Sequence, residues 1–267
     1  MKVKLIFFVL TLFWVFKLSS QTYTQESVPY VWNDISATGS LISGVNTDNG
    51  GFSKVIPFTF NYFGADYTSC YINANGLIVF NSTSTSYDNQ CFPDGNAPND
   101  CIAGYWDDLY YQKTCGASVT WRYTTLGASP NRVFVVSWIN FRHQTGGCGS
   151  YVNMQVKLYE TTNVIEVHLK SNALPINNSA TIGIENSDGT VGYHAICNEV
   201  TTDGTAWRWT PSTVCDLPED AGDISGTSSV CQGESSIAYS VPPITDADTY
   251  VWSYSGTGAT INGTTNS

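Results

Sequence analysis

Apolar and polar side chains alternate along much of this chain with a repeat of two residues. The clearest case is residues 152–158, where Val, Met, Val and Leu are separated by polar residues. After a short polar connection at 161–163, residues 165–169 alternate in the same way. Because successive side chains of a strand point to opposite faces, the two segments predict a β-hairpin with one buried face.

Other segments also favour strands. Residues 132–141 (RVFVVSWINF) are apolar at odd and even positions, which is typical of a central strand covered on both sides. Asn75-Gly76 stands between two apolar runs and predicts a tight turn. No segment has a sustained helical repeat. The pattern predicts an all-β protein built on a β-sandwich or jelly-roll-like domain.

The N-terminus reads as a targeting segment. Lys2 and Lys4 precede an unbroken apolar run, residues 5–16, which is shorter than the roughly 20 residues needed to span a bilayer. A buried core segment is the alternative, but it would be unusual at the extreme N-terminus behind two lysines. We expect residues 1–20 to be a secretory signal peptide, and no transmembrane segment is expected after its removal.

A change in composition near Pro211 indicates the domain organisation. Residues 21–213 are expected to form the first β-domain. Residues 214–223 are rich in Pro, Gly and acidic residues and are expected to be a linker. A second β-like pattern occupies residues 224–267.

Net charge excludes one class of partner. The chain has 11 basic and 22 acidic residues, and removing three lysines with residues 1–20 leaves 8 basic residues and a formal charge of −14. Such a surface repels phosphate backbones, so nucleic acid is not an expected partner. At 13% aromatic residues, the chain is too rich in rings to be disordered.

Eight cysteines follow the expected signal peptide. An even number of cysteines in an exported chain predicts disulfides, and the absence of any CxxC pair argues against a metal site. Proximity along the sequence suggests the pairs Cys91–Cys101 and Cys115–Cys148.

Asp107 and Asp108 are the most conspicuous polar pair, inside the aromatic segment 102–110. Adjacent carboxylates suit calcium, which takes six to eight oxygen ligands, so calcium is a candidate cofactor. Neighbouring strand residues point to opposite faces, which argues against an acid/base pair. A structural role, in which one carboxylate ties a loop, is the third interpretation.

No catalytic residue is assigned. The three histidines, His143, His168 and His194, form no cluster by spacing, and the chain has neither HExxH nor GxSxG. Aromatic side chains are better candidates for binding, and Tyr62, Tyr87 and Tyr110 are the candidate ligand surface. Trp207 and Trp209 share one strand face, which is either core or a binding surface, and core is favoured.

Several segments resemble one family in order. The first domain is similar to the nidogen-like (NIDO-like) β-domains of bacterial secreted and surface proteins. The matching segments are residues 56–64, 71–80, 102–110, 131–141, 156–169 and 180–194. The resemblance implies an extracellular interaction or spacer role and carries over no catalytic residue.

Residues 224–267 resemble the start of a PKD-like, immunoglobulin-type module of Bacteroidetes surface proteins. Such modules run about twice this length, so the module is expected to continue beyond Ser267. Cys231 then either lacks its partner or pairs with Cys215. The hypothesis is a non-catalytic secreted or cell-surface module for adhesion, ligand binding or spacing, with an extracellular glycan or protein ligand. Alternatives are a carbohydrate-binding module attached to a downstream hydrolase, and a hydrolase itself.

Overall fold

The computed structural model describes residues 21–42, 48–111, 119–144, 151–172, 180–199, 201–212, 222–227, 234–244, 250 and 252. These residues form antiparallel strands and no helix, which confirms the predicted all-β fold. Among them no helix is long and apolar enough to cross a membrane. The chain divides into two compact units, residues 1–213 and 214–267, and each is described by itself.

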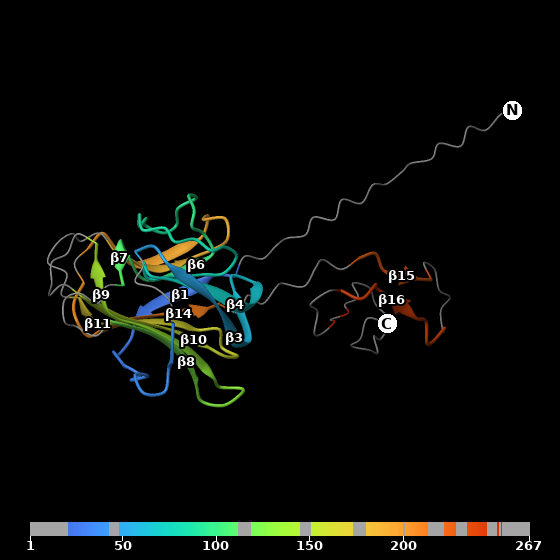
Figure 1. Cartoon of the computed structure of the whole chain (residues 1–267). Coiled ribbons are helices and arrows are strands. Elements are labelled where there is room, and N and C mark those ends of the chain that lie inside the picture. Colours follow the sequence, from blue (N-terminus) through green and yellow to red (C-terminus); the bar gives the residue numbers. More distant parts are fainter. Residues whose placement is uncertain are drawn as a thin grey trace. The chain divides into compact units, whose positions relative to one another are not determined.

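The first unit is a sandwich of two antiparallel sheets, seen edge-on in Figure 1. The larger sheet has the order β1-β14-β11-β10-β9-β8-β2, with β7 paired to β9. Its strands are β1 (Tyr23–Ser27), β2 (Ser40–Leu41), β7 (Leu109–Tyr110), β8 (Thr120–Leu126), β9 (Val133–His143), β10 (Val152–Tyr159), β11 (Ile165–Asn172) and β14 (Thr205–Pro211).

The smaller sheet has the order β13-β12-β6-β5-β4-β3. Its strands are β3 (Gly51–Tyr62), β4 (Ala65–Asn73), β5 (Leu77–Val79), β6 (Cys101–Trp106), β12 (Thr181–Glu185) and β13 (Gly192–Cys197). The main core lies between the two sheets and is built from their inward-facing side chains, with Trp138 and Trp209 fully buried in it. Trp207 is in the same cluster, so the tryptophan face of β14 is core.

The local predictions are confirmed where the alternation is strongest. β10 and β11 pair as the expected hairpin, with Val156 opposite Val167. β9 lies between β8 and β10, as a central strand should. Gly76 lies in the turn between β4 and β5 with a φ of 86°, a value that a glycine adopts without strain.

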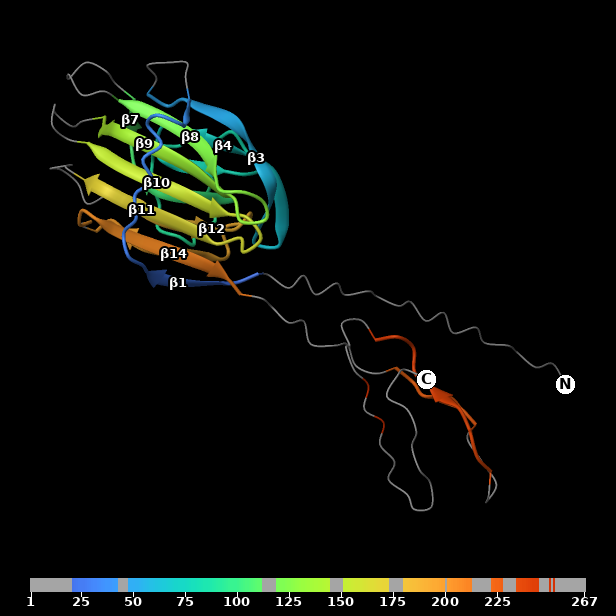
Figure 2. The same cartoon turned by 90° about the horizontal axis from the view of Figure 1, so that it is seen from below.

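One segment crosses the outer face of the larger sheet. β1 and β2 follow each other in the sequence but lie at opposite edges of that sheet. The connection between them, residues 28–39, here called the strap, therefore runs across the sheet. Figure 2 shows it in blue, passing over the neighbouring strands.

The outer face of the smaller sheet is covered as well, by residues 80–100, here called the cover loop. Phe92 of this loop packs on Trp106, with ring centroids 5.9 Å apart, in a second small core. Cys91 of the loop forms a disulfide with Cys197 of β13, with a Cα–Cα distance of 5.3 Å. The loop is thus fastened at the far edge of the sheet that it covers.

The pairing Cys91–Cys101 was therefore wrong. The cover loop carries Cys91 across β6 and β12 to β13, whereas Cys101 starts β6 and points into the second core as a buried free thiol. Proximity in sequence fails here because the loop returns to its own sheet. Cys115 and Cys148 lie outside the described residues.

The first and last strands of the first unit pair with each other. β1 and β14 are antiparallel, with Tyr23 opposite Pro211. The Ser212 backbone N–H donates to the Thr22 carbonyl oxygen at 2.8 Å. The second unit contains the antiparallel pair β15 (Ser225–Gly226) and β16 (Tyr239–Ser240).

Candidate functional site

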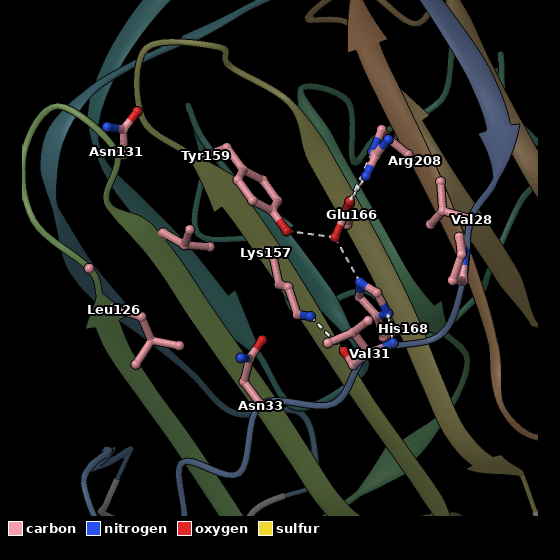
Figure 3. Close-up of a pocket in the computed structure, with 13 residues that line it drawn as sticks. Val28, Val31, Asn33, Leu126, Asn131, Lys157, Tyr159, Glu166, His168 and Arg208 are labelled. Atoms are coloured by element: carbon pink, nitrogen blue, oxygen red, sulfur yellow. Dashed lines mark hydrogen bonds and ion pairs between the residues drawn. The ribbon is translucent and has the colours of Figure 1, made fainter.

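A groove of about 440 Å³ lies between the strap and the turn that joins β8 to β9 (Figure 3). Its floor is the outer face of the larger sheet. The lining residues are Val28, Pro29, Val31, Asn33, Leu126, Gly127, Asn131, Val133, Lys157, Tyr159, Glu166, His168 and Arg208.

Strand register assembles the polar floor. Lys157 and Tyr159 are two residues apart on β10, so they project from the same face. Glu166 of β11 lies opposite Lys157 on one side and opposite Arg208 of β14 on the other. Three adjacent strands therefore bring a lysine, a glutamate and an arginine into one row.

Glu166 is the centre of the row. One carboxylate oxygen accepts from Arg208 Nε and Nη2, at 2.9 and 2.7 Å. The other accepts from the Tyr159 hydroxyl at 2.7 Å and from His168 Nε2 at 2.8 Å. Burial alone would raise the pKa of Glu166, but bonds from His168, Tyr159 and Arg208 prevail and lower that pKa to about 2.

His168 connects this row to the strap. Its Nδ1 accepts the backbone N–H of Val31 at 3.2 Å, while its Nε2 faces Glu166. An Nδ1 that accepts carries no proton, so the contacts fix the neutral ring with its proton on Nε2. Burial lowers the pKa of His168, and the opposing influence of Glu166 does not reverse it.

Side chains of β10 hold the strap backbone. Lys157 Nζ donates to the Val31 carbonyl oxygen at 2.6 Å. Gln155 binds Asn33 twice, donating to its carbonyl oxygen at 2.6 Å and accepting its N–H at 3.1 Å. The Gln155 amide and the Lys157 ammonium group thus satisfy backbone polar groups of the strap that a neighbouring strand would otherwise bind.

His168 makes stability depend on pH. Because the folded state lowers its pKa below the ordinary 6.5, the unfolded chain binds the proton more readily, and stability is lost as pH falls below about 6.5. We expect the stability advantage of the wild type over His168→Gln to shrink between pH 7.5 and pH 5. Urea unfolding at a series of pH values measures it, and a constant difference would contradict the assignment.

Tyr62 was wrong as a ligand-binding residue. It is the last residue of β3, on the inward-facing parity, and it is fully buried. Its hydroxyl donates to the Cys101 carbonyl oxygen at 2.6 Å and accepts the Glu185 N–H at 3.0 Å. Tyr87 is exposed in the cover loop and Tyr110 is half-buried on β7, and neither lines the groove.

Asp107 and Asp108 lie between β6 and β7. Asp107 is buried, and its Oδ1 accepts the Asp108 N–H at 2.9 Å and lies 3.3 Å from His143 Nε2. Burial, with Asp48 adding to it, raises the pKa of Asp108. In the part of the chain that the structure describes, no three His, Cys, Asp or Glu side chains are grouped to hold a metal ion. The contacts of Asp107 are those of a carboxylate that ties a loop.

These contacts make a prediction about calcium. If Asp107 serves the turn, a chelator should leave the melting temperature unchanged to within about 1 °C. A saturated calcium site would contribute roughly 2.7 kcal/mol at 100 times its dissociation constant, so its loss would be easily seen. Thermal melting with calcium and with excess chelator distinguishes the two results.

Sequence reasoning missed the charged row of the groove. The hairpin register alone would have placed Lys157 beside Glu166, since both are polar residues of its two alternating segments. That face was expected to meet solvent, yet Gln155, Lys157, Glu166 and His168 are all buried. No local signal in residues 28–39 indicates that they lie on this face.

Comparison with known families agrees with this architecture. A family model described as NIDO related matches residues 15–216, and one described as PKD-like domain matches residues 217–267. No curated protein and no solved structure matches the chain. Two domains of these kinds in this order suggest an extracellular β-module. Since the first model spans most of its length, the chain belongs to the NIDO-related family and carries a PKD-like domain after the NIDO-related one.

Proposed function

We propose that this chain is a non-catalytic binding module of a secreted or surface-attached adhesive protein, and that the groove beside the strap receives its ligand. The observation that carries the proposal is the form of the groove. It combines apolar walls with a few converging polar groups, and its volume of about 440 Å³ falls within the usual range for ligand sites.

The groove chemistry supports binding over catalysis. Glu166 has both oxygens bonded and a pKa lowered to about 2, so it is a poor proton donor near neutral pH. Both ring nitrogens of His168 are engaged, one by the strap and one by Glu166. A general base needs a free lone pair directed at a substrate, and neither side chain offers one.

A carbohydrate-binding module is the second candidate function. Tyr30 and Trp32 of the strap have nearly parallel rings, with centroids 6.5 Å apart and planes at 27°. Both residues are half-buried, and Lys170 Nζ lies over Trp32 at 5.3 Å from the ring centroid. Flat aromatic pairs of this kind suit sugar rings, so this pair, next to the groove, favours a glycan over other non-protein ligands.

The test is binding by the whole chain to arrays of glycans and of extracellular proteins. Val133→Trp should fill the groove and abolish capture of the ligand that the wild type binds. Val55→Trp is the matched control, because Val55 is 72% exposed on β3 of the other sheet. Capture that survives Val133→Trp would remove the groove as the site, and turnover of any bound polymer would refute the non-catalytic assignment.

A further inference from the structure

The groove contains one cation without a carboxylate partner. Two cations, Lys157 and Arg208, and a single carboxylate line it. Arg208 pairs with that carboxylate and with Glu26, whereas no ion pair to Lys157 is found among the described residues. That carboxylate, Glu166, already accepts bonds on both oxygens. Charge complementarity therefore favours an anionic occupant.

Lys157 has donors to offer such an occupant. An ammonium group carries three N–H donors. Lys157 uses one for the Val31 carbonyl oxygen, and no second partner is found among the described residues. Its side chain is one of those that line the groove, so a ligand there can meet the remaining donors, although the residue as a whole is only 2% exposed.

The walls specify the rest of the ligand. Val28, Pro29 and Val31 form the strap side, and Leu126 and Val133 form the opposite side. The backbone N–H and carbonyl of Val31 are both already bonded, to His168 and Lys157. An occupant would therefore contact the strap chiefly through apolar surface. Burial of that surface would contribute favourably to the free energy of binding.

We propose that the groove binds the carboxylate of a branched aliphatic chain, with the Lys157 ammonium as its counter-ion. The inference rests on the proposed function of the groove as the ligand site. Two sources share this chemistry, a free short-chain acid and the C-terminus of a peptide that ends in an aliphatic residue.

Protonation of Lys157 gives the binding a pH signature. Burial lowers the pKa of Lys157 to about 8, so in the empty groove the Lys157 amine is mostly protonated, and therefore charged, at pH 7. A bound carboxylate stabilises the charged form and raises this pKa. Affinity for the acid should therefore fall as pH rises from 7 to 10, while affinity for an uncharged analogue stays constant.

The experiment compares acids with their amides, using the full chain at pH 7 and calorimetry or NMR titration. Isocaproate and isocaproamide represent the free acid, and N-acetyl-leucine and N-acetyl-leucinamide represent the peptide end. Each acid that binds should do so about tenfold more tightly than its amide, as one charge-assisted hydrogen bond implies. Tighter binding of isocaproate would indicate a free acid as the natural ligand, and tighter binding of N-acetyl-leucine would indicate a peptide C-terminus.

Variants test the role of Lys157. Lys157→Met should bring the acid-to-amide ratio close to one, and Lys157→Arg should restore most of the preference. Lys157→Met loses the hydrogen bond from Lys157 to the strap at Val31. Binding of the amide probes by this variant shows that the groove is still formed. Val133→Trp leaves Lys157 in place and should abolish binding of both probes, whereas Val55→Trp should change neither.

Two results overturn the inference: equal affinity for acid and amide in the wild type, or a preference that survives Lys157→Met. If Val133→Trp abolishes macromolecular capture while no acid preference exists, the carboxylate inference fails and the proposed function stands. If Val133→Trp changes neither capture nor probe binding, the groove is not the ligand site and both fail.

Discussion

Replacing Cys91 and Cys197 together by alanine is expected to lower the free energy of unfolding by about 4 kcal/mol, and the melting temperature by about 10 °C. The disulfide joins residues 106 positions apart, so removing it frees a long loop in the unfolded chain. It also releases the cover loop at the edge strand β13. Urea unfolding of the wild type and the double variant measures the loss.

Cys101→Ala is the control for this experiment. Its thiol is buried, is not bonded to another cysteine, and donates to the Pro98 carbonyl oxygen at 3.4 Å. The change removes one packed sulfur and this weak hydrogen bond, and it should cost about 1 kcal/mol. Peptide mapping without reductant should recover Cys91 linked to Cys197, with Cys101 alkylated only after unfolding. An unaltered urea midpoint in the double variant would contradict the role of the disulfide in stability.

Glu166→Ala is expected to cost about 3 kcal/mol, the second large effect. The carboxylate is 6% exposed and accepts four hydrogen bonds from three side chains. Its removal leaves Arg208 without its buried counter-charge and the Nε2–H of the neutral His168 without its acceptor. The His168 imidazole, which accepts the Val31 N–H, is then held less firmly. We expect the strap to become sensitive to proteases before the sheets unfold.

Glu26→Ala is the matched control, because Glu26 also pairs with Arg208. Its side chain is 59% exposed and the contact is 3.4 Å long, so the change should cost less than about 1 kcal/mol. Urea unfolding gives both values, and limited proteolysis reports on the strap. Equal losses for the two variants would show that burial of Glu166 contributes nothing.

Period-two alternation was a sound guide to the strands. It placed the β10–β11 hairpin and the tryptophan face of β14, while the lack of alternation in residues 132–141 placed the central strand β9. Each of these predictions depends only on which side chains are apolar. It also predicted an all-β sandwich. The same rule applied to β3 would have assigned Tyr62 to the core, because Tyr62 shares the parity of Phe58 and Phe60.

What the sequence could not reveal depends on contacts between distant segments. The strap carries no repeat, and it lies on β10 only because β1 and β2 are at opposite edges of the sheet. Lys157 and His168 look like solvent-facing residues until that crossing is known. Likewise, the partner of Cys91 follows from the path of the cover loop, which no local pattern encodes.

The pairing of the first strand of the first unit with its last has a mechanical consequence. Tension applied through residues 22 and 212 would act at one end of the antiparallel β1–β14 pair, where Tyr23 faces Pro211. Under tension in that direction, the hydrogen bonds between the two strands break one after another from that end. They do not bear the load together, as they would if the strands were pulled past each other in shear. As a link in series the domain would peel open at low force, whereas at the tip of a fibre, held through β14 alone, it would bear no load across this pair.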